Sequence, residues 1–188
     1  MAAYAFARLD FDLKAPFFAI MFGTMMLPFH VTLIPRYIIF YRLGWVDSYL
    51  PLTVPAFFAV NGFFIFLMVQ FMRGIPVELD HAAKVDGCGP IQVYLRIILP
   101  LSMPALVTAA IFSFIWTWND FFSQLIYISN PRLYTIALGL RAFQDATSAS
   151  AFGQMFAMSI LSLVPIFIFF VSAQKLLIEG ITTTGMKG

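Results

Sequence analysis

Long stretches without a charged residue most constrain what this chain can fold into. Four such stretches lie between charged residues: Ala15–Pro35, Ser48–Met72, Ile97–Asn119 and Ala146–Gln174. Each is long enough for a bilayer-spanning helix, which needs about 20 predominantly apolar residues. Spans of this kind are helical, because backbone in hydrocarbon must satisfy its own hydrogen bonds. The sequence therefore predicts an all-α, polytopic membrane protein with about four transmembrane helices.

Composition agrees with a membrane protein and argues against other classes. Hydrophobic residues make up 61% of the chain and charged residues 11%, against roughly 45–50% and 25% in a soluble domain. The net charge is only +2 and the basic residues are scattered, so no nucleic-acid partner is expected. Cys88 is the only cysteine, which excludes an intrachain disulfide and a cysteine-based metal cluster.

The sequence also lacks the short motifs that carry enzymatic chemistry. It has no G-x-x-x-x-G-K-[ST] phosphate loop, no G-x-S-x-G and no HExxH. Its two histidines, His30 and His81, form no paired cluster. We therefore expect a protein that is not an enzyme, with no cofactor and no metal site of its own.

Lys and Arg residues set the expected orientation. With four spans, one side carries Arg8, Lys14, Arg73, Lys84, Arg96, Lys175 and Lys187, and the other carries Arg36, Arg42, Arg132 and Arg141. The positive-inside rule places the larger set in the cytoplasm. Both termini of this multi-pass cell-membrane protein, and the segment 78–104, are therefore predicted to be cytoplasmic.

Prolines interrupt the predicted spans. Pro28 and Pro165 lie deep within the first and fourth stretches, where a missing backbone N–H is expected to kink the helix. Pro51, Pro100 and Pro104 lie near the ends of stretches and are expected to mark helix termini. Transporters tolerate such breaks where the freed carbonyls face neighbouring helices or a cavity.

A short stretch rich in charge, "ELDHAAKVDGCGP", stands out in this apolar chain. It predicts a helix from Pro76 to Asp86, because proline suits the first helical position and acidic side chains favour the first turn. Asp80 and Lys84 are spaced as an i,i+4 ion pair. Gly87 is expected in the left-handed conformation that ends a helix.

The charged helix also has features of a docking surface. Ala82 and Ala83 are expected to form a small face that permits close approach of another protein. A second short helix is predicted from Pro90 to Pro100, so that two short cytoplasmic helices lie between two spans. The residues alone leave two interpretations open: a docking element for a cytoplasmic partner, or a solvated loop with ordinary caps.

The segments "HAAKVDG" and "IILPLSMP" resemble the EAA loop of ABC-importer permeases, whose pattern is E-A-A-x-x-x-G followed by I-x-L-P. The matching residues are Ala82, Ala83, Gly87, Ile97, Leu99 and Pro100. Five further segments, "YAFARLDF", "MLPFHVTLIPRY", "WNDFF", "YTIALGL" and the C-terminal "KG", resemble the sugar-importer branch of the maltose-permease type. The resemblance runs nearly from end to end.

This resemblance implies a membrane-spanning permease subunit of an ATP-binding-cassette importer that translocates a sugar or oligosaccharide. The implied partners are ATP-binding subunits at the cytoplasmic face, which hydrolyse the ATP, a second permease subunit, an extracytoplasmic solute-binding protein and the lipid bilayer. A single permease domain is expected over residues 1–188, with a cytoplasmic EAA coupling loop over residues 76–99. Because "YAFARLDF" resembles the end of a second span, the domain is expected to be N-terminally incomplete, without the first span and most of the second.

The resemblance also implies which residues couple to the ATPase. They are Glu78, Asp80, His81, Ala82, Ala83, Asp86 and Gly87. His81 stands where the family pattern has its leading glutamate. Glu78 or Asp80 is then the expected source of the carboxylate.

Polar residues in or near the spans are candidates for the translocation pathway. They are His30, Trp118, Asn119 and Asp120. A carboxylate near the end of a span is costly unless it is paired or faces water, so Asp120 either lines the pathway or caps a loop. A lone histidine in a span is more often a packing or pore residue than a metal ligand. The segment Asn130–Asp145 resembles the loop that meets the binding protein.

Other functions remain compatible with these observations. Broken spans and Asp120 also fit a stand-alone channel or a secondary transporter, although such a protein has no need of the charged helix and its Gly-Pro break. A third possibility is a non-functional truncated permease, since the missing spans would normally pack against the rest of the domain.

Overall fold

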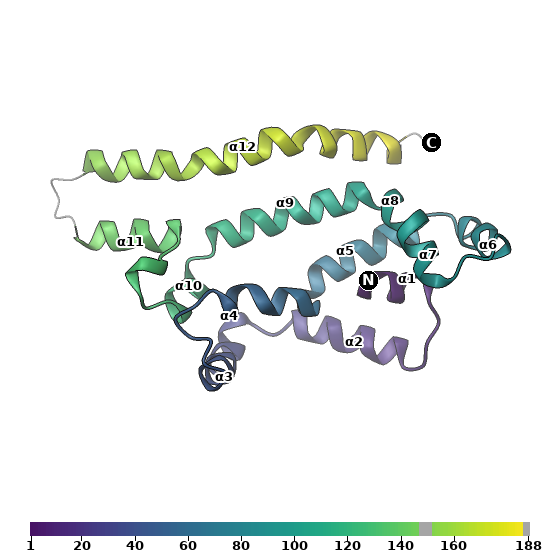
Figure 1. Ribbon diagram of the computed structural model, residues 1–188, viewed down its shortest axis with the longest axis horizontal. Helices are drawn as coiled ribbons and strands as arrows, with labels where there is room; N and C mark the ends of the chain where they lie inside the picture. Colours follow the sequence, from purple (N-terminus) through teal and green to yellow (C-terminus); the bar gives the residue numbers. More distant parts are fainter. Residues whose placement is uncertain (147–151, 186–188) are drawn as a thin grey trace. The chain divides into compact units, whose positions relative to one another are not determined.

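The computed structural model describes residues 1–146 and 152–185 of the 188-residue chain, which Figure 1 traces in sequence order. Within these ranges every regular element is helical and no strand occurs, which confirms the all-α prediction. The elements are α1 (Ala2–Arg8), α2 (Lys14–Met25), α3 (Phe29–Arg42), α4 (Leu50–Thr53), η1 (Val54–Phe58), α5 (Gly62–Arg73), α6 (Glu78–Val85), α7 (Pro90–Val93), η2 (Tyr94–Ile98), α8 (Leu99–Leu101), α9 (Met103–Asn119), α10 (Phe122–Tyr127), η3 (Pro131–Leu133), α11 (Ile136–Ala146) and α12 (Phe152–Gly185). Of these, η1 and η3 are 3₁₀ turns and η2 is a π-helical turn.

Several helical segments are candidates for membrane spans. Leu50–Arg73 and Gly153–Ser172 are each long and apolar enough to cross a bilayer unaided. Two more candidates arise if each of two bent helix pairs counts as one span: α2 with α3, and Pro90–Leu101 with α9. The described residues thus hold up to four spans, in agreement with the predicted number.

The prolines occupy both breaks and helix interiors. α3 begins directly after Pro28, which separates it from α2 as predicted. Pro51 lies in the first turn of α4 and marks a helix start. Pro100 is the second-last residue of α8, just before the 73° bend to α9, and Pro104 is the second residue of α9. Both prolines therefore lie near helix termini, as predicted. The π-helical turn before Pro100 accommodates a residue that cannot donate a backbone hydrogen bond. Pro165 lies inside α12, which continues through it as one helix.

The chain forms two compact units. The first combines Met1–Leu27, Asn61–Ala110 and Lys175–Gly188, and the second combines Pro28–Val60 and Ile111–Gln174. Each unit therefore joins segments that are distant in the sequence. The charged stretch belongs to the first unit, and the pathway candidates belong to the second.

In the first unit, α1 packs along α5, as Figure 1 shows. The apolar side of α5 is formed by Met68, Val69 and Met72, which are at most 6% exposed. The core around them also includes Ala3, Tyr4, Ile75, Ala83, Val93, Tyr94, Ile98 and Ala105. This core therefore joins a candidate membrane helix, α5, to the short helices α6 and α7 that follow it.

In the second unit, the loop after α3 fixes the turn that follows α10. Asp47 has a left-handed φ of 62°, and its Oδ1 accepts hydrogen bonds from the backbone N–H groups of Ser129 and Asn130 at 2.9 and 2.7 Å. The hydroxyl of Tyr49 donates to the carbonyl of Leu133 at 3.0 Å. These bonds satisfy the backbone of the 129–133 turn, which leads into the segment 130–145 formed by η3 and α11.

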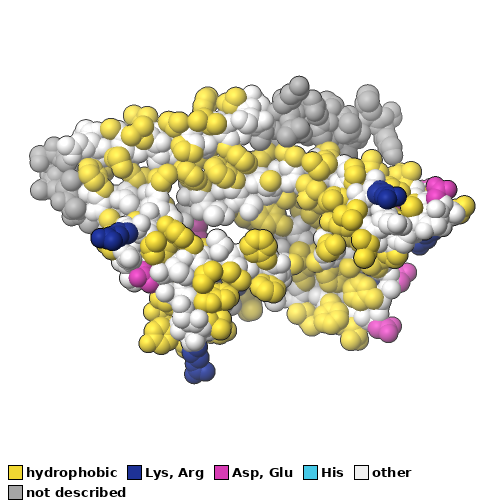
Figure 2. Space-filling model, in the orientation of Figure 1, with side chains coloured by type: hydrophobic (Ala, Val, Ile, Leu, Met, Phe, Trp, Pro, Cys, Tyr) yellow, Lys and Arg dark blue, Asp and Glu magenta, His cyan; other side chains and the backbone are white. Residues whose placement is uncertain are grey.

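Much of the apolar side-chain surface is left uncovered by the chain itself. None of the segment Gly153–Ser172 in α12 is buried, and Ile160 and Phe167 expose 64% and 69% of their area. Hydrophobic side chains are spread over the face in Figure 2, on which charged side chains are few. A helix that is apolar on all sides requires lipid or another apolar partner. The exposed apolar surface therefore fits a membrane protein.

Candidate functional site

α6, the helix of the charged stretch, has a narrow buried side and a broad exposed side. On the buried side, Asp80 and Ala83 are 6% and 4% exposed. The opposite side presents exposed residues at positions i, i+3, i+4 and i+7, which share one helix face. These residues, called here the exposed stripe, are Glu78, His81, Ala82 and Val85. Val85 exposes 88% of its area although it is apolar, so nothing within the described chain covers this face.

The prediction that Ala82 and Ala83 form one small docking face is wrong. Consecutive residues of an α-helix point about 100° apart, and the structure turns Ala83 into the core while Ala82 stays exposed. Asp80 is turned inward as well, because it lies one turn before Ala83 on the same side. Of the two carboxylates considered as replacements for the missing family glutamate, Glu78 is therefore the one on the exposed stripe.

α6 ends as the sequence predicts. Gly87 has a φ of +80°, in the left-handed region. The N–H of Cys88 donates to the carbonyl of Ala83 at 2.9 Å, and the N–H of Gly87 donates to the carbonyl of Lys84 at 3.0 Å. This pair of bonds is the Schellman motif. Apart from Gly87 itself and its two chain neighbours, no heavy atom lies within 4 Å of the point where a Cβ at Gly87 would lie, so the demand for glycine there is conformational and not steric.

α6 begins two residues later than predicted. Its first residue is Glu78, and Pro76 lies in the connection from α5. The proline therefore fixes the backbone just before the helix instead of occupying its first position. α7 begins at Pro90 as predicted, and the N–H of Gly89 donates to the side-chain oxygen of Gln92 at 2.9 Å.

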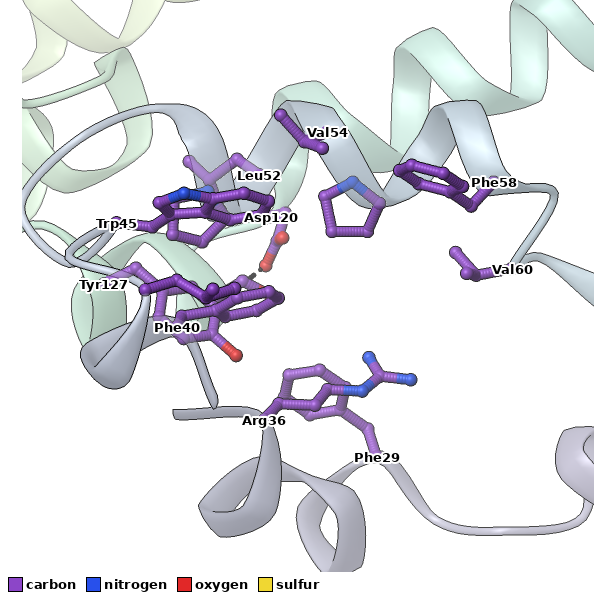
Figure 3. A pocket seen from close by; sticks show the side chains of 14 residues that line it. Phe29, Arg36, Phe40, Trp45, Leu52, Val54, Phe58, Val60, Asp120 and Tyr127 are labelled. Carbon is purple, nitrogen blue, oxygen red and sulfur yellow. Dashed lines mark hydrogen bonds between the residues drawn. The ribbon is translucent and has the colours of Figure 1, made fainter. Parts of the chain in front are cut away.

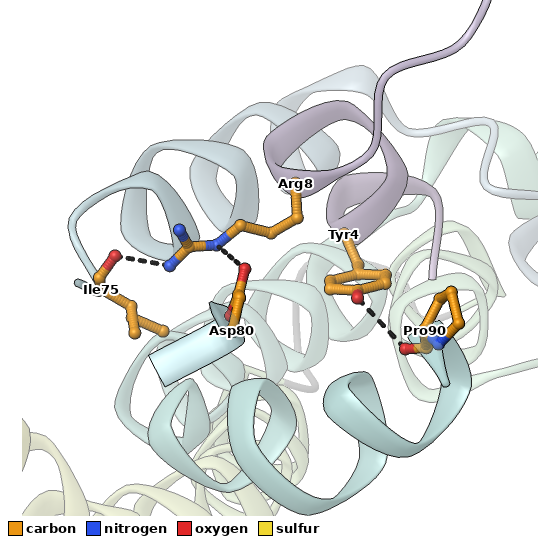
Figure 4. Close-up of polar contacts among 5 residues, drawn as sticks. All are labelled: Tyr4, Arg8, Ile75, Asp80 and Pro90. Atoms are coloured by element: carbon orange, nitrogen blue, oxygen red, sulfur yellow. Dashed lines mark hydrogen bonds and ion pairs between the residues drawn. The ribbon is translucent and has the colours of Figure 1, made fainter. Parts of the chain in front are cut away.

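A side chain of α1 reaches the start of this loop, as Figure 4 shows. The guanidinium of Arg8 donates to the carbonyl of Ile75 at 2.5 Å, and its Nε lies 3.5 Å from Oδ2 of Asp80. The Arg8 and Asp80 side chains are 7% and 8% exposed. The predicted i,i+4 pair of Asp80 with Lys84 is therefore replaced by a buried pair with Arg8, because Asp80 faces the core and Lys84 does not.

A second side chain of α1 reaches the end of the loop. The hydroxyl of Tyr4 donates to the carbonyl of Pro90 at 3.1 Å, and its ring lies 5.0 Å from the ring of Tyr94, centroid to centroid. Burial and then the nearby Asp80 carboxylate raise the pKa of the Tyr4 hydroxyl above its ordinary value, and the smaller opposing effect of the Arg8 guanidinium does not cancel the rise. The hydroxyl therefore stays protonated and remains a donor at physiological pH.

The second unit contains an open cavity of about 430 Å³, shown in Figure 3. One wall is aromatic: Phe40 stacks on Trp45 with ring centroids 5.7 Å apart and meets Tyr127 edge-on at 5.3 Å. Arg36 and Asp120 are the two charged residues among those that line it. A mostly apolar, aromatic cavity with a few polar groups is the usual form of a small-molecule site.

Asp120 has both of the roles considered for it. It lines the cavity, and its Oδ1 accepts a hydrogen bond from the backbone N–H of Ser123 at 3.1 Å, which caps the start of α10. Arg36, across the cavity in Figure 3, lies 5.9 Å from the ring centroid of Phe29 in a cation–π contact. A carboxylate and a guanidinium therefore border one aromatic cavity.

The other three pathway candidates do not line this cavity. Trp118 stacks on Phe114 with centroids 5.4 Å apart. The side chain of Asn119 donates to the carbonyl of Ile115 at 2.7 Å, within the last turn of α9. His30, near the start of α3, lies 5.4 Å from the ring of Phe122. These contacts describe local packing in each case.

Within residues 1–146 and 152–185, no group of three or more His, Cys, Asp and Glu side chains is placed to hold a metal ion. Cys88 is a partly buried free thiol. Lys187 and the C-terminal "KG" segment lie outside the described residues.

The sequence alone does not point to the role of α1. Arg8 contributes to the charge asymmetry and Tyr4 belongs to a family-like segment, but neither signals contact with residues 75–90. The available sign is an arginine within the apolar "YAFARL", since a buried guanidinium requires a partner. The aromatic wall of the cavity has no comparable local signal, because aromatic residues occur throughout this chain.

Comparison with known proteins identifies similar chains. Residues 1–182 match the family model described as the binding-protein-dependent transport system inner membrane component. Similar proteins include the arabinooligosaccharides transport system permease protein AraQ of Halalkalibacterium halodurans (32% identical over 100% of this chain and 66% of AraQ) and the trehalose/maltose transport system permease protein MalG of Thermococcus litoralis (32% over 100% of this chain and 68% of MalG). The sn-glycerol-3-phosphate transport system permease protein UgpE of Rhizobium meliloti is 32% identical over 98% of this chain and 65% of UgpE. The chain thus spans about two thirds of the length of these relatives.

Proposed function

Because the chain belongs to the family of binding-protein-dependent transport system inner membrane components, which are permeases and not enzymes, we propose that it is a membrane-spanning permease subunit of an ATP-binding-cassette importer. Its substrate is a sugar or oligosaccharide. AraQ and MalG are named for such solutes, and UgpE is named for sn-glycerol-3-phosphate, a small polyhydroxylated solute. All three names therefore favour a hydroxyl-rich substrate.

The exposed stripe of α6 is the observation that carries this proposal. α6 lies outside the candidate spans, and its outward face combines a carboxylate, an imidazole, a methyl group and the 88% exposed Val85. In a solvated loop nothing would require the exposed stripe to be held rigidly. Here the buried Arg8–Asp80 pair fixes the opposite side of α6. An ATP-binding subunit docks on Glu78, His81, Ala82 and Val85. That subunit binds and hydrolyses the ATP, and the chain itself needs no cofactor.

Transport then follows from two alternating states. The ATP-binding subunits change shape on binding and hydrolysing ATP, and they move α6 as a rigid body. The spans of this chain and of a second permease subunit open to one side and then to the other. A solute-binding protein delivers the sugar on the extracytoplasmic side, where it meets the segment 130–145.

Reconstitution with the partner subunits tests the proposed function. The chain is co-expressed with a candidate ATP-binding subunit, second permease and binding protein, and vesicles are assayed for ATP-dependent uptake of labelled maltose, trehalose and arabinooligosaccharides. We expect co-purification of the ATP-binding subunit and uptake only with ATP. The isolated chain should bind no nucleotide, since its sequence holds no phosphate-binding loop. Stoichiometric nucleotide binding by the isolated chain, or sugar flux without the ATP-binding subunit, would contradict the proposal.

Thiol labelling tests the orientation. On a Cys88→Ser background, a cysteine at exposed Arg132 should react with a membrane-impermeant thiol reagent in intact cells, because the smaller basic set lies outside. A cysteine at exposed Val85 should react only after the cells are broken. The reverse pattern at the two positions would show that α6 is extracytoplasmic and would end its assignment as a docking helix.

The cavity of the second unit is a surface along which the sugar passes. Aromatic faces pack against the C–H faces of sugar rings, and a carboxylate accepts hydrogen bonds from their hydroxyl groups. Phe40, Trp45 and Tyr127 supply the rings, and Asp120 supplies the carboxylate. These residues contact the substrate transiently. Substituting them should therefore change the KM of uptake.

Two substitutions at Asp120 separate its substrate contact from its structural bond. Asp120→Asn keeps an oxygen that accepts from Ser123 but removes the charge, so we expect uptake KM to rise about tenfold with the chain's thermal stability unchanged. Asp120→Ala also removes the cap and should lower stability by about 1 kcal/mol. Uptake kinetics and thermal melting in detergent measure the two effects. An unchanged KM in Asp120→Asn would restrict Asp120 to capping α10.

A further inference from the structure

We propose that α1 is a clamp that fixes the α6 loop at both ends, with Arg8 and Tyr4 as positioning residues that transmit the movement of α6 to the membrane helices. The expected effect of the clamp on transport rests on the proposed function. The expected effect on α6, that two α1 side chains determine how rigidly it is held, depends only on the observed contacts.

The two residues are spaced to act together. Tyr4 and Arg8 are four residues apart and lie on one face of α1. Arg8 binds the carbonyl of Ile75 before α6, and Tyr4 binds the carbonyl of Pro90 after it. Figure 4 shows the two side chains pointing from α1 toward these two places. Every residue of α6 therefore lies between two points that are tied to the same helix.

The Arg8–Asp80 pair adds a third tie, inside α6 itself. Oδ1 of Asp80 is buried and has no hydrogen-bond donor among the described residues. The charge of Asp80 therefore depends on Arg8, 3.5 Å from Oδ2. Removing one partner of a buried ion pair leaves an uncompensated charge, which the structure relieves by exposing it. Without Arg8, α6 is expected to be held less firmly and to vary more in its orientation, so that Asp80 reaches water in some of the molecules.

The clamp has a direct route to the membrane helices. α1 packs along α5, whose buried side is Met68, Val69 and Met72, and α5 belongs to the candidate span Leu50–Arg73. A force on α6 therefore reaches α5 through α1 as well as through the short connection 74–77. Together with the packing of Ala83 in the core, the ties through α1 hold α6 where the four-residue connection alone would act as a hinge.

The chain supplies its own matched control. Lys14 and Asp10 form an ion pair at 3.4 Å, close to the 3.5 Å of the Arg8–Asp80 pair, but their side chains are 28% and 105% exposed against 7% and 8%. Exposed pairs of this kind contribute little to stability. Lys14 also donates to a backbone carbonyl, that of Leu9 at 2.7 Å, as Arg8 does to Ile75. Lys14→Met therefore removes a charge, an ion pair and a bond to a carbonyl in the same unit without freeing a buried carboxylate.

The first test measures how rigidly α6 is held and needs no partner subunit. Spin labels are placed at exposed Ile20 and Val85 on a Cys88→Ser background, and their distance distribution is measured in the full chain reconstituted in lipid. We expect a narrow distribution in the parent and in Lys14→Met, and a distribution about twice as wide in Arg8→Met. Arg8→Lys should lie between them, since lysine keeps the charge but lacks the fork that reaches both Asp80 and Ile75. Tyr4→Phe should broaden the distribution less than Arg8→Met does.

The second test measures coupling in the complex with its ATP-binding subunit. Arg8→Met leaves the exposed stripe intact, so co-purification of that subunit should stay at the parent level. The number of sugar molecules transported per ATP hydrolysed should fall about tenfold, with partial recovery in Arg8→Lys. A residue that only stabilised the fold would lower the amount of complex without changing this ratio.

The outcomes separate the clamp from the proposed function. Parent-like distance distributions in both Arg8→Met and Tyr4→Phe would overturn the clamp, and so would equal broadening in Lys14→Met. If Arg8→Met fails to accumulate in the membrane, the distance distribution of Arg8→Lys is compared with that of the parent. Equal widths in these two would likewise overturn the clamp. A parent complex without ATP-dependent uptake would refute the proposed function while leaving the distance measurements fully interpretable.

Discussion

Gly87→Val should abolish transport while leaving the chain in the membrane. At φ +80° a β-branched side chain is strained, and a non-glycine residue held in this region costs about 1–3 kcal/mol. Relief of the strain opens the Schellman bonds from Gly87 and Cys88 and changes the angle at which α6 leaves the loop. We expect uptake and co-purification of the ATP-binding subunit to fall by at least about tenfold. Membrane fractionation, pull-down and uptake measure the three quantities.

Gly44 provides a matched control for this substitution. It has a φ of +69°, open space where a Cβ would lie, and the same pattern of bonds: its N–H donates to Tyr41 and that of Trp45 donates to Phe40. Gly44→Val should therefore cost a similar amount of stability in the second unit but keep the ATP-binding subunit bound. Gly89→Ala, at a φ of −74°, should be neutral. Full ATPase binding and uptake in Gly87→Val would remove the α6 loop from the coupling mechanism.

Ala83→Leu and Ala82→Leu should fail for different reasons although they add the same atoms to adjacent residues. Ala83 is 4% exposed and packs in the core with Met72 and Val93. The larger side chain there overpacks the core, which typically costs about 1–3 kcal/mol. The thermal midpoint of the purified chain should fall even without any partner. Uptake should be lost because α6 is displaced from its packed position against the core.

Ala82→Leu should leave the isolated chain intact. Ala82 is exposed, and substitutions at such positions change stability by about 0.5 kcal/mol or less. The added side chain instead occupies the centre of the exposed stripe, so the ATP-binding subunit should no longer co-purify. Melting of the chain in detergent and pull-down with the ATP-binding subunit give the comparison. Equal melting temperatures for the two variants would show that Ala83 is not packed in the core, and retained co-purification in Ala82→Leu would place the docking face elsewhere.

Features decided by local chemistry were predictable from the sequence. The charge-free stretches predict the helical spans because hydrocarbon excludes unpaired backbone and charge, whatever the helices pack against. Gly87 predicts the end of α6, and Pro28 predicts the break before α3, because both act through their own backbone geometry. The family-like pattern around Ala82 and Gly87 likewise indicates the permease family without any coordinates.

The orientation of α6 about its own axis was not predictable in this way. A short helix with alanines on adjacent positions and acids on several sides has no unique apolar face to read, so Asp80 and Ala83 could point in or out. Arg8, whose ion pair with Asp80 fixes this orientation, lies on a helix far away in the sequence. Likewise, the aromatic cavity assembles side chains from α3, the loop after it, α4, η1 and α10.

The sequence by itself thus determined that this chain crosses a membrane, that α2 and α3 are separated at Pro28 and that α6 ends at Gly87. These properties follow from hydrophobicity, proline and glycine acting on the backbone near them. Only the tertiary structure decided that Asp80 pairs with Arg8, that Glu78, His81, Ala82 and Val85 face outward, and that Asp120 borders a cavity. Those outcomes depend on the cost of burying a charge without a partner, and the position of the partner is set by how the helices pack together.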